Sequence, residues 1–172
     1  MDFDSIDKGS NPLPVANFYW GYSMDTERVR FHKEVIKGYI SSFENYPLLN
    51  PMTSINFTYF GHQWETIIQA YNALSQGKEK DSDKIKLMGN ILYSFFLQNE
   101  VARNELFSTK QMWIENKVDN HDNFWHNCKC PKCFIEQGLN YYGRLLMEVR
   151  DRLIWEEKPK HNSSKRWQVR YF

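Results

Sequence analysis

An acidic residue and an indole three positions apart form the most chemically suggestive pair in the chain. They are Asp122 and Trp125, in the run Asp-Asn-Phe-Trp. An indole can stack on a flat ring, and a carboxylate beside it can stabilise positive charge that develops there. A structural interpretation is equally open, with the aspartate in a turn and the tryptophan in the core.

A helix predicted soon after this pair would carry further polar groups. The spacing of apolar residues predicts it from Asn140 to about Glu157. Its first amides could face an anion such as a diphosphate, because helix N-termini attract negative charge. Asn140 and Gly143 lie at that end, but asparagine is also a good helix cap and glycine allows close approach of another backbone. Arg150 could hold a phosphate or pair with a neighbouring surface carboxylate.

Three cysteines close together in sequence form a candidate metal site. Cys128, Cys130 and Cys133 are the only cysteines in the chain. They could hold a structural zinc ion if a fourth ligand joins them, and His121 and His126 are the nearest candidates. Because a single tight cluster lacks the second ligand pair of common zinc motifs, free thiols are the default interpretation.

Hydrophobic periodicity predicts the elements that must position these residues. Helices are expected at about 25–43, 64–75, 83–98 and 100–107, besides the one that begins at Asn140. Strands are expected at 15–22, 55–61 and 166–172, and residues 117–138 lack a helical period. We therefore predict an α+β class, a mainly helical single domain with a small β-sheet.

Composition limits the classes of protein to which the chain can belong. Its 172 residues are enough for one domain with a real core, and 16% aromatic residues argue against disorder. A net charge of +1 gives no globally basic surface that would demand nucleic acid. No signal peptide, membrane span or disulfide framework is predicted. We expect a cytoplasmic protein without a membrane partner; the sequence leaves the oligomeric state open.

Several segments resemble the NADAR-domain, or YbiA-like, family. The family's closing motif pairs an acid-x-x-Trp step with a later Gly-x-Asn-x-x-Gly-x-x-Leu-Met-x-x-Arg helix, similar to Asp122–Trp125 and to residues 138–150 here. Upstream, residues 40–47 resemble the family's Phe-Ser-Asn-Phe…Pro entry segment, and residues 65–70 resemble its Glu-His-x-x-Gln-Ala helix. Residues 82–109 are similar to the helical segment that follows, so the resemblance covers residues 17–155.

The resemblance implies a YbiA-like fold and an N-glycosidase activity. The expected reaction is hydrolysis of a ribosyl–base bond, most plausibly removal of ADP-ribose from modified guanine in nucleotides or in DNA, with DNA as the carrier. A related phosphoribosyl N-glycoside is another substrate that fits. No cofactor is required by this chemistry.

The resemblance also implies roles for individual residues. Glu65 and Asp122 would be catalytic. The expected substrate-binding residues are Trp125, Gln69, Asn140, Gly143, Phe18, Phe43 and Glu115. For Glu65, a solvated glutamate at a helix start is the alternative interpretation.

The expected domain boundaries follow from the same comparison. Residues 1–15 would be a flexible lead-in, 16–157 a NADAR-like domain and 158–172 a basic, aromatic extension. The extension suits an edge strand with solvated cations, although it could also touch a nucleic-acid backbone.

The chain departs from the family pattern close to the expected pocket. Thr66 stands where the family has a histidine, Asn72 where it has a lysine, and His126 where it has a glycine. These changes allow altered substrate choice or lost activity with retained binding. The alternative function is therefore a non-catalytic module that binds ADP-ribose or a nucleotide.

Overall fold

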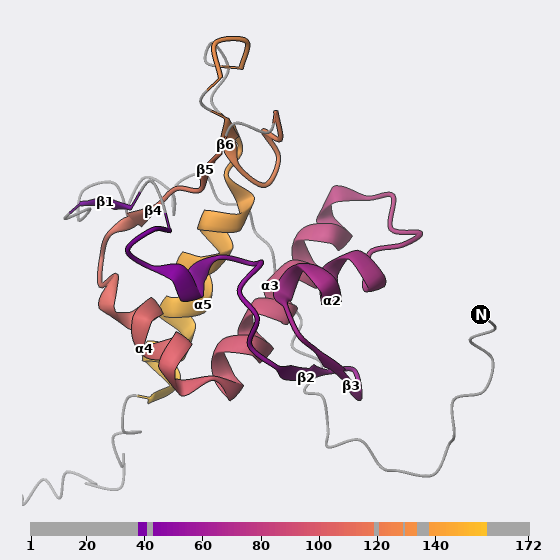
Figure 1. Cartoon of the computed structure of the whole chain (residues 1–172), viewed down its shortest axis with the longest axis vertical. Helices are drawn as coiled ribbons and strands as arrows, with labels where there is room; N and C mark the ends of the chain where they lie inside the picture. Colours follow the sequence, from indigo (N-terminus) through magenta and orange to yellow (C-terminus); the bar gives the residue numbers. More distant parts are fainter. Residues whose placement is uncertain (1–37, 41–42, 119–120, 129, 134–137, 158–172) are drawn as a thin grey trace, which may run out of the picture.

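Figure 1 shows the computed structural model of the chain, and the structure describes residues 38–40, 43–118, 121–128, 130–133 and 138–157. The strands expected at 15–22 and 166–172 lie outside these residues, as do Phe18 and the terminal segments 1–15 and 158–172. Of the helix expected at 25–43, only the last part is described.

Helices make up about half of the described chain. They are α2 (Ile67–Leu74), α3 (Asp81–Gln98), α4 (Glu100–Ser108) and α5 (Tyr141–Glu157), with a 3-10 turn η1 (Pro47–Leu49) before them. The predicted helices at 64–75, 83–98, 100–107 and from 140 are confirmed to within three residues. In Figure 1, α5 runs from the region of β5 and β6 down beside α4, and it packs against α3, α4 and β4.

The core forms where these helices meet. Apolar side chains repeat at helical spacing along α3 and α5, so each helix turns one face inward. That face buries Ile85, Met88, Leu92, Phe95 and Phe96 of α3 and Leu145, Leu146, Val149 and Leu153 of α5. In the part of the chain that the structure describes, no helix is both long enough and apolar enough to cross a membrane.

The strands form three separate pairs. β1 (Tyr39–Ile40) runs parallel to β4 (Trp113–Ile114), and β5 (Lys117–Val118) runs parallel to β6 (Asn127–Cys128). β2 (Phe57–Tyr59) and β3 (His62–Trp64) form an antiparallel hairpin. The predicted α+β class is confirmed, with the expected small sheet divided into these pairs.

One predicted helix end is wrong, and the start of another helix is displaced by three residues. The helix expected to reach Phe43 does not, because Tyr39 and Ile40 are extended and the carbonyls of Gly38 and Ile40 accept hydrogen bonds from β4 and the residue after it. The helix expected from Trp64 begins at Ile67 instead. Positive φ angles at Phe60 (52°) and Gly61 (74°) turn the chain back on itself, and this turn places Trp64 in a strand.

Candidate functional site

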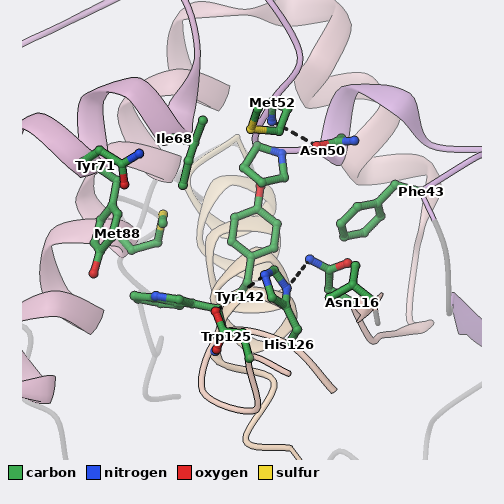
Figure 2. A pocket seen from close by; sticks show the side chains of 14 residues that line it. Phe43, Asn50, Met52, Ile68, Tyr71, Met88, Asn116, Trp125, His126 and Tyr142 are labelled. Carbon is green, nitrogen blue, oxygen red and sulfur yellow. Dashed lines mark hydrogen bonds and ion pairs between the residues drawn. The ribbon is translucent and has the colours of Figure 1, made fainter. Parts of the chain in front are cut away.

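A cavity of about 560 Å³ opens between α2, the segment after η1 and the turn that contains Trp125. Its volume lies within the range of about 300–1,000 Å³ that is usual for small-molecule sites. Figure 2 shows Tyr71 and Ile68 on one side, Phe43 and Asn116 on the other, and Tyr142 between them. The lining residues are Phe43, Asn50, Pro51, Met52, Ile68, Tyr71, Asn72, Met88, Asn116, Val118, Asp122, Trp125, His126 and Tyr142.

Asp122 holds the turn that carries the tryptophan. Its Oδ1 accepts hydrogen bonds from the backbone N–H of Phe124 (2.9 Å) and of Trp125 (3.0 Å). Its Oδ2 lies 3.9 Å from Nε2 of His126, which is an electrostatic contact rather than a hydrogen bond. The acid-x-x-Trp spacing thus places the carboxylate and the indole on one cavity wall.

An asparagine fixes the orientation of His126. The side-chain amide of Asn116 donates to Nδ1 of His126 at 2.6 Å, so the remaining ring proton belongs on Nε2 and faces Asp122. Burial lowers the pKa of His126, although the nearby Asp122 opposes this shift. The imidazole is therefore neutral near pH 7.

Aromatic rings form much of the remaining wall. Trp125 packs edge-to-face on Tyr71 at a centroid distance of 5.3 Å, and Phe43 lies edge-on to Tyr142 at 6.1 Å. Burial raises the pKa of Tyr71, so its hydroxyl stays protonated at neutral pH. A cavity with this lining suits a flat, uncharged ring.

The start of α5 is engaged in holding the fold together. The backbone N–H groups of Tyr141 and Tyr142 donate to the carbonyls of Phe124 and Trp125, both at 3.1 Å. The expectation that the first amides of this helix face a diphosphate is therefore wrong for these two groups. They anchor the turn that carries Trp125 to the helix.

Asn140 and Gly143 serve the same junction and do not line the cavity. Asn140 is buried, and its backbone adopts a positive φ of 52°. Its side chain donates to the Ile114 carbonyl and accepts from the Asn116 N–H, both at 3.0 Å. A Cβ at Gly143 would lie 2.3 Å from the Ile114 carbonyl oxygen, so only glycine lets α5 approach β4 this closely. Of the two interpretations drawn from the sequence, the geometry favours the structural one.

Glu65 and Gln69 lie at the start of α2, outside the cavity lining. Thr66 is the N-cap, and its hydroxyl accepts from the Gln69 N–H at 3.1 Å. The Gln69 side chain in turn accepts from the N–H of Glu65, the residue before the N-cap, at 2.9 Å. Glu65 itself is exposed and precedes the helix. The departure from the family at Thr66 thus supplies a helix cap.

The third predicted carboxylate is not among the described residues that line the cavity either. Glu115 is half-buried, pairs with Lys117 at 2.9 Å and accepts from the Asn127 side chain. Phe43 and Trp125 are the predicted binding residues that do line the cavity. Asn116 and Tyr71 line the cavity but were not predicted as site residues. Asn72 was noted only as a departure from the family pattern, and His126 only as such a departure and as a candidate metal ligand.

Among the described residues that line the cavity, only Asp122 carries a charge near pH 7. Among the described lining residues there is no lysine or arginine, and Asp122 is the one carboxylate. Arg150, a candidate phosphate ligand, is buried and donates instead to the Thr109 hydroxyl (2.9 Å) and the Met112 carbonyl (3.0 Å). It also pairs with the neighbouring carboxylate of Asp151 at 3.1 Å, which is the alternative that the sequence left open.

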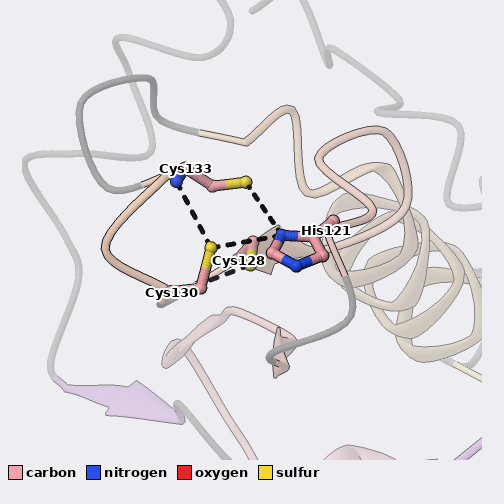
Figure 3. A group of neighbouring side chains, drawn as sticks. All are labelled: His121, Cys128, Cys130 and Cys133. Carbon is pink, nitrogen blue, oxygen red and sulfur yellow. Dashed lines mark hydrogen bonds between the residues drawn. The ribbon is translucent and has the colours of Figure 1, made fainter.

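A second group of side chains lies directly beside the site. Figure 3 shows His121, Cys128, Cys130 and Cys133 turned toward one another, with all four ligand atoms within 4.8 Å of each other. The crowding of thiols raises the pKa of Cys133 to about 11, mainly through its hydrogen bond with Cys130. These four donors lie close enough to coordinate one metal ion. Of the two histidines named from the sequence, His121 joins the cluster and His126 lines the cavity.

Comparisons with known proteins bear on the fold. No family model matches the chain, and no curated protein matches it by sequence. Among solved structures, the NMR structure of the E. coli protein YbiA is similar, with a TM-score of 0.57 and 20% sequence identity. The match covers 74% of this chain and 90% of that one. The fold predicted from the NADAR motifs is thus confirmed: the chain has the YbiA-like α+β fold.

Proposed function

We propose that this protein is an N-glycosidase that hydrolyses a ribosyl–base bond in a nucleotide or in modified DNA. ADP-ribose attached to guanine is the substrate most in keeping with the NADAR motifs, and a related phosphoribosyl N-glycoside is the next. The observation that carries the proposal is the cavity in which the Asp122 carboxylate and the Trp125 indole share a wall. The protein would act in the cytoplasm.

Asp122 would supply the electrostatic part of the reaction. As the C–N bond breaks, positive charge develops on the anomeric carbon and the ring oxygen of the ribose, and a nearby carboxylate lowers the energy of that state. Its Oδ1 is held by two backbone N–H groups and its Oδ2 faces His126, so the carboxylate is fixed in place before substrate arrives. The same carboxylate could orient the attacking water.

Trp125 would hold the base. Its ring lies at right angles to Tyr71 and Phe124, and the described lining is otherwise apolar or uncharged apart from Asp122 and the neutral His126. Because that lining contains no cation, the cavity would take the base and ribose, and the phosphates would point out of it. Ribosyl and ADP-ribosyl forms of one base should then be cleaved with similar kcat and different KM.

The test compares wild type with Asp122→Asn on guanine-ADP-ribosylated DNA and on free ADP-ribosyl nucleosides. Asparagine keeps an oxygen that can cap the turn, removes the charge and places an amide NH2 where Oδ2 faces His126. We expect kcat/KM to fall at least about a hundredfold. Asp83→Asn, at an exposed position in the first turn of α3, is the matched control and should retain full activity. Wild-type turnover by Asp122→Asn would refute this role.

Glu65→Gln belongs in the same assay, because the role of Glu65 rests on the family resemblance alone. Glu100→Gln, exposed in the first turn of α4, is its control. A loss of turnover in Glu65→Gln only would assign the second acid. Equal rates in both variants would leave Asp122 as the single catalytic carboxylate.

A second candidate function is a binding module for ADP-ribose or a nucleotide. The observation that favours it is that Glu65 and Glu115 do not line the cavity, which leaves one carboxylate among the described lining residues. Titration calorimetry that finds tight ADP-ribose binding, together with no hydrolysis of any of these substrates, would select it.

No cofactor takes part in the proposed reaction. A zinc ion at the cysteine cluster would be structural, because four protein ligands leave no open position for a reacting water.

A further inference from the structure

We propose that His121, Cys128, Cys130 and Cys133 bind one zinc ion, and that this ion holds in place the turn that carries Asp122 and Trp125. The proposal does not depend on the reaction suggested above. It rests on the geometry of the four donors and on where they lie in the chain.

The spacing of the donors fits tetrahedral coordination. Nδ1 of His121 lies 3.2 Å from Sγ of Cys130 and 3.5 Å from Sγ of Cys133, and all four ligand atoms are within 4.8 Å of one another. Ligands at about 2.0–2.3 Å from a tetrahedral zinc ion are separated by roughly 3.5–3.8 Å. The four side chains therefore need to move little to bind one ion.

The chemistry of the donors selects the metal. Three thiols and one imidazole form a soft set that suits zinc, whereas calcium and magnesium require oxygen ligands. An odd number of cysteines also cannot be satisfied by disulfides within the cluster, and all three are free here.

Backbone groups around the sulfurs support the same role. The N–H of Cys130 points at Sγ of Cys128 (3.5 Å), and the N–H of Cys133 points at Sγ of Cys130 (3.3 Å). Such N–H groups stabilise metal-bound thiolates and orient them. Figure 3 shows both contacts, one between Cys130 and Cys128 and the other between Cys133 and Cys130.

The position of the ligands in the chain connects the metal to the candidate site. His121 directly precedes Asp122, and Cys128 closes the same segment at the end of β6. Between them lie the turn capped by Asp122 and the cavity residues Trp125 and His126. Because this segment contains no helix and only two strand residues, the metal would fix both of its ends.

Metal analysis of the full-length protein, purified in reducing buffer without chelators and supplied with zinc, is the first test. We expect about one zinc ion per chain, and its loss in His121→Ala and Cys133→Ser. His126→Ala is the matched control, because the sequence named it as the other fourth ligand and the geometry excludes it; it should keep the ion. The ligand set would be overturned if wild type contains no zinc. It would also be overturned if His121→Ala keeps the zinc ion while His126→Ala loses it.

Cobalt substitution guards against variants that fail to fold, because it uses the wild-type chain. Co²⁺ bound to three thiolates and an imidazole should give the intense visible bands of a tetrahedral site and sulfur-to-metal charge transfer in the ultraviolet. Weak octahedral bands, or no change in the spectrum on adding Co²⁺, would overturn the proposal.

The positioning role is read from the tryptophan. In an ¹⁵N spectrum the indole signal of Trp125, assigned by its loss in Trp125→Phe, should shift or broaden when zinc is removed with a chelator and recover when zinc returns. The indole of Trp155, exposed near the other end of α5, is the internal control and should stay unchanged. Zinc removal that leaves the Trp125 signal unmoved would refute the positioning role while leaving the metal site intact.

Discussion

The substitution Gly143→Ala should destabilise the protein, although alanine is the better helix former. The added Cβ would lie 2.3 Å from the Ile114 carbonyl oxygen and 2.7 Å from both Oδ1 and Nδ2 of Asn140. None of these atoms can move freely, because one is backbone and the others hold the link between β4 and β5. Both neighbours must therefore give: α5 shifts away from β4, and the Asn140 side chain leaves its two partners.

The magnitude follows from three contributions. Overpacking of this kind costs about 1–3 kcal/mol, and each of the two hydrogen bonds of Asn140 contributes about 1 kcal/mol. Replacing glycine within a helix returns about 1 kcal/mol. We expect a net loss of about 3 kcal/mol in the free energy of unfolding, or a fall in Tm of roughly 6–12 °C for a protein of this size.

Urea unfolding, followed by far-ultraviolet circular dichroism, measures the change. Gly89→Ala is the matched control, since this glycine is also helical and buried, and a Cβ there would meet only the Leu145 side chain at 3.2 Å. It should change stability by less than about 1 kcal/mol. If Gly143→Ala is as stable as Gly89→Ala, the close approach of α5 to β4 does not explain why position 143 is a glycine.

Three further predictions concern polar groups that are buried or partly buried. Arg150→Met should cost about 2–3 kcal/mol in the unfolding free energy, because it removes the donor to two buried acceptors. The control Arg152→Met, at a surface ion pair, should cost less than about 1 kcal/mol. Equal losses in the two variants would contradict this prediction. Tyr142→Phe should cost about 1 kcal/mol, measured in the same way, since the Leu49 carbonyl loses its donor; no loss would mean that another donor, such as water, replaces it. Burial raises the pKa of Glu105 in the folded protein, so its ionised form opposes folding at neutral pH and this opposition fades as the pH falls. Glu105→Gln, which keeps an acceptor for the backbone amide at 2.7 Å, should therefore gain stability relative to wild type at pH 7 and lose that gain by pH 4; an equal difference at both values would refute the shift.

The sequence predicted the helices because their apolar residues repeat over several turns. The stripe expected in α3, from Ile85 to Phe96, is buried as predicted. β1 and β4 have two residues each, and two residues carry no periodicity, so their pairing could not be predicted. β3 follows from the turn at Phe60 and Gly61, where a non-glycine residue adopts a positive φ without an obvious sequence signal.

From residue spacing alone, the candidate site was predictable only where its residues are neighbours in sequence, whereas Phe43 was predicted from the family resemblance. Asp122 and Trp125 share a turn, and their spacing alone indicates that they meet. Asn116 reaches His126 because β5 pairs with β6 in one particular register, which depends on the folded chain. For the same reason the sequence could not decide whether His121 or His126 is the fourth ligand of the cysteine cluster.

The hydrogen bond from Tyr142 to the Leu49 carbonyl has a consequence for how the protein folds. It joins residues 93 positions apart, and the helices α2, α3 and α4 lie between them in the chain. Helices form in about a microsecond, whereas contacts so distant in sequence must first overcome the entropy of closing a long loop. We expect refolding to proceed through early pairing of α3 with its neighbours and a slower docking of α5. The cavity is lined on one side by Asn50–Met52 and on the other by Trp125 and Tyr142, so the ability to bind a ligand should return with that last, slow step.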